Sequence, residues 1–188
     1  MLAAELRAVP WAVPGAIAVL IIASVSSGYL SRRLDVAWGA AFWLVVSLGA
    51  IVVATLTPGI DAGAGRQRFA SFSFDSGAWQ RLTSLNAISL NVLLFMPLAG
   101  LAVAGPRRVR LALTLVAVAL VLPVAIEWTQ WLFPQLGRTG FQLTIALMNT
   151  LGVLIGAVFG LFIRTWIGPM GARPNHPAAQ TTAAIVSR

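Results

Sequence analysis

Five long apolar runs constrain the fold of this chain more than any other feature. They cover about residues 11–30, 36–57, 85–104, 111–133 and 142–163. A helix of about 20 apolar residues crosses the roughly 30 Å hydrocarbon layer of a bilayer. Each backbone polar group in lipid must be satisfied inside the structure, so runs of this kind span as helices. The sequence therefore predicts an all-α, polytopic transmembrane helix bundle with about five spans.

The composition also indicates an integral membrane protein of one domain. Of the 188 residues, 59% are hydrophobic and 10% are charged, against about 25% charged in a soluble domain. The chain has no cysteine, and its single histidine, His176, lies in a polar tail. These two facts exclude disulfides, thiol chemistry and multi-histidine metal sites. We expect no cofactor.

The first run also has some features of a signal peptide. Small residues, Ser26 to Gly28, follow it, but the preceding MLAAELR carries one Glu and one Arg. It therefore lacks the net positive charge that precedes a cleaved signal. We interpret the run as a helix and keep cleavage as the less favoured alternative.

The arginines set the expected orientation, since every basic residue is an arginine and the net charge is +8. The side that faces the cytoplasm should carry the excess in its short loops. One side of the predicted bundle carries Arg32, Arg33, Arg107, Arg108, Arg110, Arg164, Arg173 and Arg188. The other carries Arg7, Arg66, Arg68, Arg81 and Arg138. We predict a multi-pass plasma-membrane protein with its N-terminus outside and its C-terminus cytoplasmic, and no role in nucleic-acid binding.

Two hydrophilic segments lie outside the predicted spans. The loop 58–84 is expected outside the cell and is rich in glycine and serine. Its aromatic residues are Phe69, Phe72, Phe74 and Trp79. Anchoring at the headgroup layer is the favoured interpretation, and a ligand-binding lid is the alternative. The transmembrane domain is expected over residues 1–168, followed by a disordered cytoplasmic tail over 169–188.

Three spans place a strongly polar side chain at one level of the outer leaflet. Asn91, Glu127 and Asn149 each lie six or seven residues from the predicted outer end of their run, about 9–10 Å deep by helical rise. Gln130 shares a helix face with Glu127 at i+3. Arg138, in the loop between the last two spans, is the nearest cation and could close the outer mouth.

The interpretation of these residues differs by type. Asparagine and glutamine in membrane helices often only join helices, which is the favoured reading of Asn91 or Asn149 taken alone. A buried carboxyl group is expensive in lipid, so Glu127 favours a functional role, with Asn91 and Asn149 as candidate hydrogen-bond donors. We interpret Glu127, Gln130, Asn91, Asn149 and Arg138 as a ligand-binding site.

A stripe of small residues marks the last run. Gly152, Gly156 and Gly160 recur at i, i+4 and i+8, which lets another helix approach closely. We assign this stripe to packing and not to a site. Pro97 and Pro123 fall inside predicted helices and are expected to kink them.

Four motifs together resemble the VanZ-like family of small membrane proteins. They are NVLLFMPLAG from Asn91, IEWTQ from Ile126, the Gly137–Arg138 pair and NTLGVLIG from Asn149. The resemblance covers about residues 86–160, or about 40% of the chain. Its hallmark positions are Asn91, Pro97, Gly100, Glu127, Gln130, Arg138, Asn149 and Gly152.

The resemblance implies a link to low-level teicoplanin resistance at the bacterial cell envelope. Two departures put this in question. The family usually has an aspartate four residues before the last asparagine, where this chain has Ile145. Many members also have an Asp-Lys…His motif in the first outer segment, which is missing here.

Three functions remain open from the sequence. The favoured one is binding of membrane amphiphiles, such as a lipid-linked wall precursor or a lipoglycopeptide, with Arg138 suited to an anionic headgroup. An intramembrane enzyme would use Glu127 as general acid or base. The helices show no nucleophile–base pair and no second outer-leaflet carboxylate, so an enzyme is disfavoured. A proton-coupled transporter would carry its proton on Glu127, and a homo-oligomer would suit that function.

Overall fold

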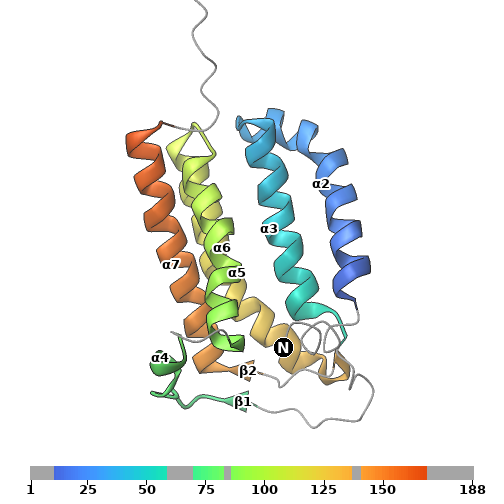
Figure 1. The fold of residues 1–188 in the computed structure, drawn as a ribbon, viewed down its shortest axis with the longest axis vertical. Helices are drawn as coiled ribbons and strands as arrows, with labels where there is room; N and C mark the ends of the chain where they lie inside the picture. Colours follow the sequence, from blue (N-terminus) through green and yellow to red (C-terminus); the bar gives the residue numbers. More distant parts are fainter. Residues whose placement is uncertain (1–10, 59–69, 83–85, 137–140, 169–188) are drawn as a thin grey trace, which may run out of the picture.

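The protein is described here from a computed structural model that covers residues 11–58, 70–82, 86–136 and 141–168. It is a helix bundle (Figure 1). The long helices are α2 (Ala12–Leu34), α3 (Trp38–Leu56), α5 (Ala87–Ala104), α6 (Val109–Leu132) and α7 (Leu143–Trp166). Shorter elements are β1 (Ala70–Ser71), α4 (Ala78–Arg81), η1 (Pro134–Leu136) and β2 (Phe141–Gln142). The predicted helical membrane bundle is confirmed.

Four of the long helices are long and apolar enough to cross a membrane. They are α2, α3, α6 and α7, with 19 to 24 residues each. Helix α5 is shorter, and its 18 residues extend about 27 Å by helical rise. It packs against α3, α6 and α7. The crossing of the bilayer by α5, and hence the fifth span, stays a prediction.

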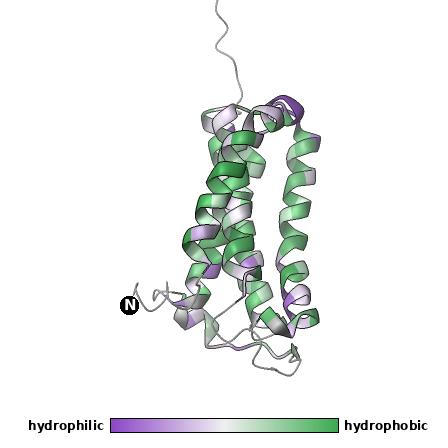
Figure 2. Ribbon diagram, turned by 90° about the vertical axis from the view of Figure 1, so that its right-hand side faces the viewer, coloured by the Kyte–Doolittle hydropathy of each residue, from purple (hydrophilic) through white to green (hydrophobic). Residues whose placement is uncertain are grey.

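Hydrophobic residues predominate along the middle of the helices, and hydrophilic residues gather towards their ends (Figure 2). The core between α3, α5, α6 and α7 includes Ile51, Phe95 and Ile126. Many large apolar side chains face outward instead, among them Val25 at 81% and Val158 at 70% exposed. Apolar surface of this extent, on helices long enough to span a bilayer, is typical of a membrane protein.

The two ends of the bundle differ in composition. We call one end the arginine end, which holds the α2–α3 turn, the α5–α6 turn and the last residues of α7 (Figure 1). The opposite end, with β1, β2 and α4, we call the strand end. This arrangement brings the arginine-rich short loops to one end, as the predicted topology requires. Which end faces the cytoplasm stays a prediction.

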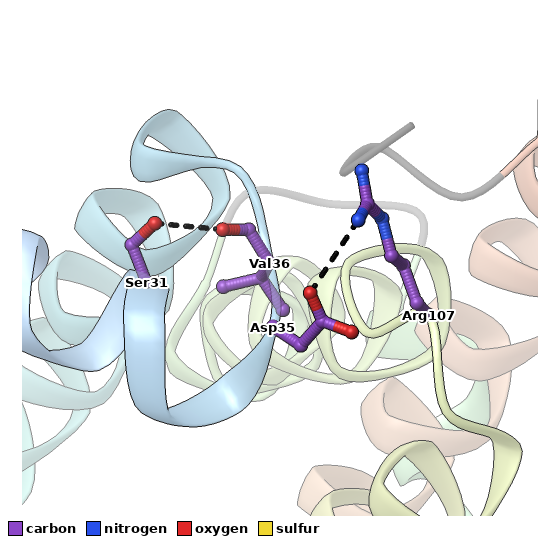
Figure 3. A network of polar contacts seen from close by, with 4 residues as sticks. All are labelled: Ser31, Asp35, Val36 and Arg107. Carbon is purple, nitrogen blue, oxygen red and sulfur yellow. Dashed lines mark hydrogen bonds and ion pairs between the residues drawn. The ribbon is translucent and has the colours of Figure 1, made fainter. Parts of the chain in front are cut away.

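An ion pair joins the two turns at the arginine end. Arg107 lies 3.5 Å from the Asp35 carboxylate, and Ser31 donates a hydrogen bond to the Val36 carbonyl at 2.8 Å (Figure 3). Asp35 ends α2 in the left-handed conformation, with φ 50°. A short polar side chain tolerates that conformation better than most residues. The α2–α3 turn is thereby held against the α5–α6 turn.

The glycine stripe of α7 faces α5. A methyl group added at Gly152, Gly156 or Gly160 would overlap the backbone of Val92, Met96 or Gly100, respectively. The two backbones are therefore in direct contact, which only glycine permits. The stripe is a packing device, as predicted. Pro97 and Pro123 both lie inside their helices, as expected.

Candidate functional site

The polar residues predicted for a site lie near the strand end on three helices. Asn91 is on α5, Glu127 and Gln130 are on α6, and Asn149 is on α7. Asn91, Glu127 and Asn149 stand four to six residues from the nearby ends of their helices, so about 6–9 Å deep by helical rise. Arg138 lies outside the described residues. The three side chains thus lie at similar distances from the strand end, and their depth in a bilayer stays a prediction.

Glu127 is buried, with 2% of its surface exposed. Its Oε2 accepts a hydrogen bond from the backbone N–H of Gln142 at 2.9 Å. Gln142 is the N-cap residue of α7. At this end the first N–H groups of a helix lack intrahelical partners, and the helix dipole favours a negative charge. The carboxylate thus joins the end of α6 to the start of α7.

The expected hydrogen bonds from Asn91 and Asn149 to Glu127 do not occur within the described part of the chain. The backbone N–H of Gln142 takes the place of an amide side chain as donor. A carboxylate has about four lone-pair sites on its two oxygens. The contact with Gln142 occupies one of them, so Glu127 retains capacity for a further donor.

Gln130 joins two helices. Its side chain is 8% exposed, and its Nε2 donates to the backbone carbonyl of Thr55 at 2.9 Å. Thr55 lies next to the end of α3 at Leu56, where the last carbonyls of a helix lack intrahelical partners. This contact is the joining role that glutamine commonly has in membrane helices.

Asn149 has the most unusual environment of the four. It is 1% exposed, and its Oδ1 has no hydrogen-bond partner among the described residues. Asn149 lies one turn before Gly152, whose face of α7 packs against α5. A buried acceptor without a donor costs about 1–3 kcal/mol. Asn91, in contrast, is half-buried.

A short segment covers the start of α7. Strands β1 and β2 pair in parallel, with Ala70 beside Phe141. The backbone N–H of Asp75 donates to Thr144 Oγ1 at 2.9 Å. The rings of Phe72 and Phe141 lie 5.3 Å apart between centroids. The segment from Ala70 is therefore fixed to α7 at several points.

Aromatic side chains surround this segment and Glu127. Trp128, which follows Glu127, lies 6.4 Å from Phe141 and 5.2 Å from Trp131 between ring centroids. Phe72, Phe74 and Trp79 are exposed. This exposure is compatible with the predicted contact with headgroups, which stays a prediction. Phe69 lies outside the described residues.

Three contributions to this end were missed by reasoning from the sequence. The backbone N–H of Gln142 and the backbone carbonyl of Thr55 have no side-chain signature. Thr144 was a detectable candidate, because a hydroxyl in the first turn of a helix commonly contacts the preceding chain. Ile145, where the family usually has an aspartate, is half-buried beside Thr144.

Comparisons with known proteins give a family and no individual relative. No curated protein and no solved structure matches this chain at a significant level. A family model described as VanZ/LLP1 matches residues 42–164, from the first turn of α3 to the last turn of α7. The match covers more than half of the chain and includes Asn91, Glu127, Gln130 and Asn149. The chain therefore belongs to the VanZ/LLP1 family of proteins.

Proposed function

We propose that this protein binds an amphiphilic molecule of the cell envelope at the strand end, through Glu127 and Asn149. The ligand classes are a lipid-linked wall precursor and a lipophilic glycopeptide of the teicoplanin type. Arg138 would contact an anionic headgroup. A role in low-level glycopeptide resistance would follow from such binding.

The unpartnered Oδ1 of Asn149 carries this proposal. Buried polar groups in native proteins nearly always have a partner, so an exception calls for a specific explanation. Asn149 shares its depth with Glu127, whose carboxylate also has unused acceptor capacity. Two buried acceptors at one level form a site for a ligand that brings hydrogen-bond donors.

The ligand classes follow from that chemistry. Sugar hydroxyls and peptide amides are donors, and wall precursors and glycopeptides carry both. A lipid tail would suit the apolar surface of the helices, and Trp128 offers an exposed ring beside Glu127. The arginine distribution predicts that the strand end faces outward, where such ligands occur.

The test uses the purified full chain in nanodiscs and teicoplanin as the probe. Asn149→Leu removes the unsatisfied acceptor and keeps a branched side chain. We expect it to lower teicoplanin affinity at least tenfold while thermal stability is unchanged or higher, because a buried acceptor without a donor is costly. Unchanged affinity in a folded Asn149→Leu protein would contradict the proposal.

A cellular experiment gives a second readout. In a host lacking the native copy, we expect Glu127→Gln to keep membrane abundance and to reduce survival on teicoplanin. Survival on a glycopeptide without a lipid tail should change less. A fall in abundance would instead identify Glu127 as a structural group, and normal survival would remove it from this function.

Proton-coupled transport is the second candidate, because Glu127 is a buried carboxyl group in a membrane-spanning helix. Intramembrane residues of this kind often carry protons in transporters. Transport predicts uptake of the ligand that rises with an imposed pH gradient and fails in Glu127→Gln. Binding without transport predicts saturable retention that is independent of the gradient.

A further inference from the structure

A groove opens on the outer surface of the bundle between α5 and α7. Its volume is about 260 Å³. Pro97, Gly100 and Leu101 line it from α5, and Gly156, Phe159 and Ile163 line it from α7. Pro97 and Phe159 are exposed, while Gly100 and Gly156 are buried. Because the two glycines have no side chains, their backbone forms the floor of the groove.

The groove lies in the half of the molecule nearer the arginine end. Ile163, at one end of it, directly precedes Arg164. Gly156 lies seven residues earlier, about 10 Å deeper by helical rise. The lining is apolar along this length. A hydrocarbon chain in the adjacent leaflet matches both the depth and the chemistry of the groove.

Arg164 holds the mouth of this groove in place. Its guanidinium donates to the carbonyls of Val103 at 2.9 Å, Pro106 at 2.7 Å and Arg107 at 3.0 Å. These carbonyls belong to the end of α5 and the turn that follows it. The end of α7 is thereby bound to the α5–α6 turn. Three of its five N–H donors bind the protein itself, so we assign Arg164 to positioning and the ligand contact to other arginines.

Two other arginines remain available beside the mouth. Arg107 is paired with Asp35 (Figure 3). Arg108 is the next residue and Arg110 lies two positions further on. Both are exposed and have no ion-pair partner in the parts of the chain that the structure describes. Figure 1 shows the α5–α6 turn between the end of α7 on one side and the α2–α3 turn on the other.

We propose that the groove and these two arginines bind an anionic phospholipid from the leaflet at the arginine end. One acyl chain would lie in the groove, and the phosphate would contact Arg108 and Arg110. Arginine suits a phosphate because its planar fork can make two parallel hydrogen bonds. This site is separate from the proposed envelope-ligand site at the strand end and does not depend on it.

Charge favours a lipid over a second copy of this chain in the groove. A second copy in the same orientation would bring its own arginine end to the same membrane surface, and like charges that meet across an interface oppose association. An anionic headgroup complements the two free guanidinium groups. Basic pockets between helices on the cytoplasmic side of membrane proteins commonly bind anionic headgroups.

Native mass spectrometry of the purified full chain tests the proposal, with phosphatidylglycerol and phosphatidylcholine of equal acyl chains as probes. We expect phosphatidylglycerol to bind more tightly, by about fivefold for each arginine. The double variant Arg108→Gln/Arg110→Gln should lower its affinity to that of phosphatidylcholine. The matched control Arg32→Gln/Arg33→Gln removes the same charge from the last turn of α2, on the side of the α5–α6 turn away from α7, and should keep the preference.

The groove itself is tested by filling it. Ile163→Trp should weaken binding of both lipids, whereas Leu161→Trp, at an exposed position of α7 outside the groove, should not. Equal affinity of the unaltered chain for the two lipids would overturn the proposal. Equal losses in the two arginine double variants would also overturn it, since they would indicate diffuse surface charge only. A dimer that Ile163→Trp disperses would identify a second copy as the occupant instead.

Discussion

The two ends of the bundle differ in how fully their polar side chains are hydrogen-bonded. At the arginine end, the guanidinium of Arg164 makes three hydrogen bonds to backbone carbonyls, and Arg107 is paired with Asp35. At the strand end, Glu127 makes one hydrogen bond to a backbone N–H, and the Oδ1 of Asn149 makes none among the described residues. Helix α7 contributes to both ends, with Asn149 near its start and Arg164 in its last turn.

This difference separates structural polarity from polarity that is available to a ligand. A satisfied buried group stabilises the fold and has no capacity left for another molecule. An unsatisfied one lowers stability and is retained where it has another role. The strand end is therefore the better candidate for recognition of a polar headgroup, and the arginine end of the α5–α7 pair is the better fixed.

The largest effect is expected where the two ends share the α5–α7 contact. Gly156→Leu would drive a side chain into the backbone of Met96, and overpacking costs about 1–3 kcal/mol even where the neighbours can move. We expect little folded protein at the membrane, measured as monodisperse protein after solubilisation. The matched control is Gly28→Leu, which meets nothing within 4 Å. Equal yields of both variants would show that the contact does not support both ends.

The next effect is expected at the arginine end. Arg164→Gln would leave most of its three part-buried carbonyl acceptors without a donor, at about 1–3 kcal/mol. Thermal unfolding in detergent should therefore begin at a clearly lower temperature. Arg110→Gln, which removes an exposed arginine at the same end, is the control and should unfold with the unaltered chain. If Arg164→Gln proved as stable as the unaltered chain, the hydrogen bonds of Arg164 would not stabilise the arginine end.

A smaller effect is expected at Glu127, and it depends on the substituent. Glu127→Gln keeps an acceptor for the backbone N–H of Gln142, so a loss of under about 1 kcal/mol is expected. Glu127→Leu leaves that N–H without an acceptor and should cost about 1–3 kcal/mol. Thermal unfolding of both variants measures the difference. If Glu127→Leu proved as stable as the unaltered chain, the hydrogen bond to Gln142 would have no structural role.

The smallest effect is expected at the ion pair between the turns. The side chains of Arg107 and Asp35 are 35% and 43% exposed, and exposed pairs contribute about 0–1 kcal/mol. Asp35→Asn should change unfolding by no more than that, and added salt should reduce the difference further. If Asp35→Asn lowered the stability as much as Arg164→Gln does, the ion pair would be the main stabilising contact of the arginine end.

The helical class and the packing face of α7 were predictable from the sequence. Long apolar runs demand helices because lipid offers no partner for backbone groups, and Gly152, Gly156 and Gly160 recur at the helical repeat. The burial of Glu127, Gln130 and Asn149 followed from the cost of polar groups in lipid. Their partners did not follow, since Glu127 and Gln130 bond to the backbone of Gln142 and Thr55.

The sequence by itself therefore determined the apolar segments that form the long helices, the gathering of arginines in the short loops and the positions of the polar residues along their helices. These properties depend on position along one helix. Only the tertiary structure decided that Arg164 binds three backbone carbonyls, that Asn149 Oδ1 has no donor among the described residues and that a groove lies between α5 and α7. These properties depend on backbone groups and surfaces of several helices, and every residue type carries the same backbone N–H and carbonyl except proline.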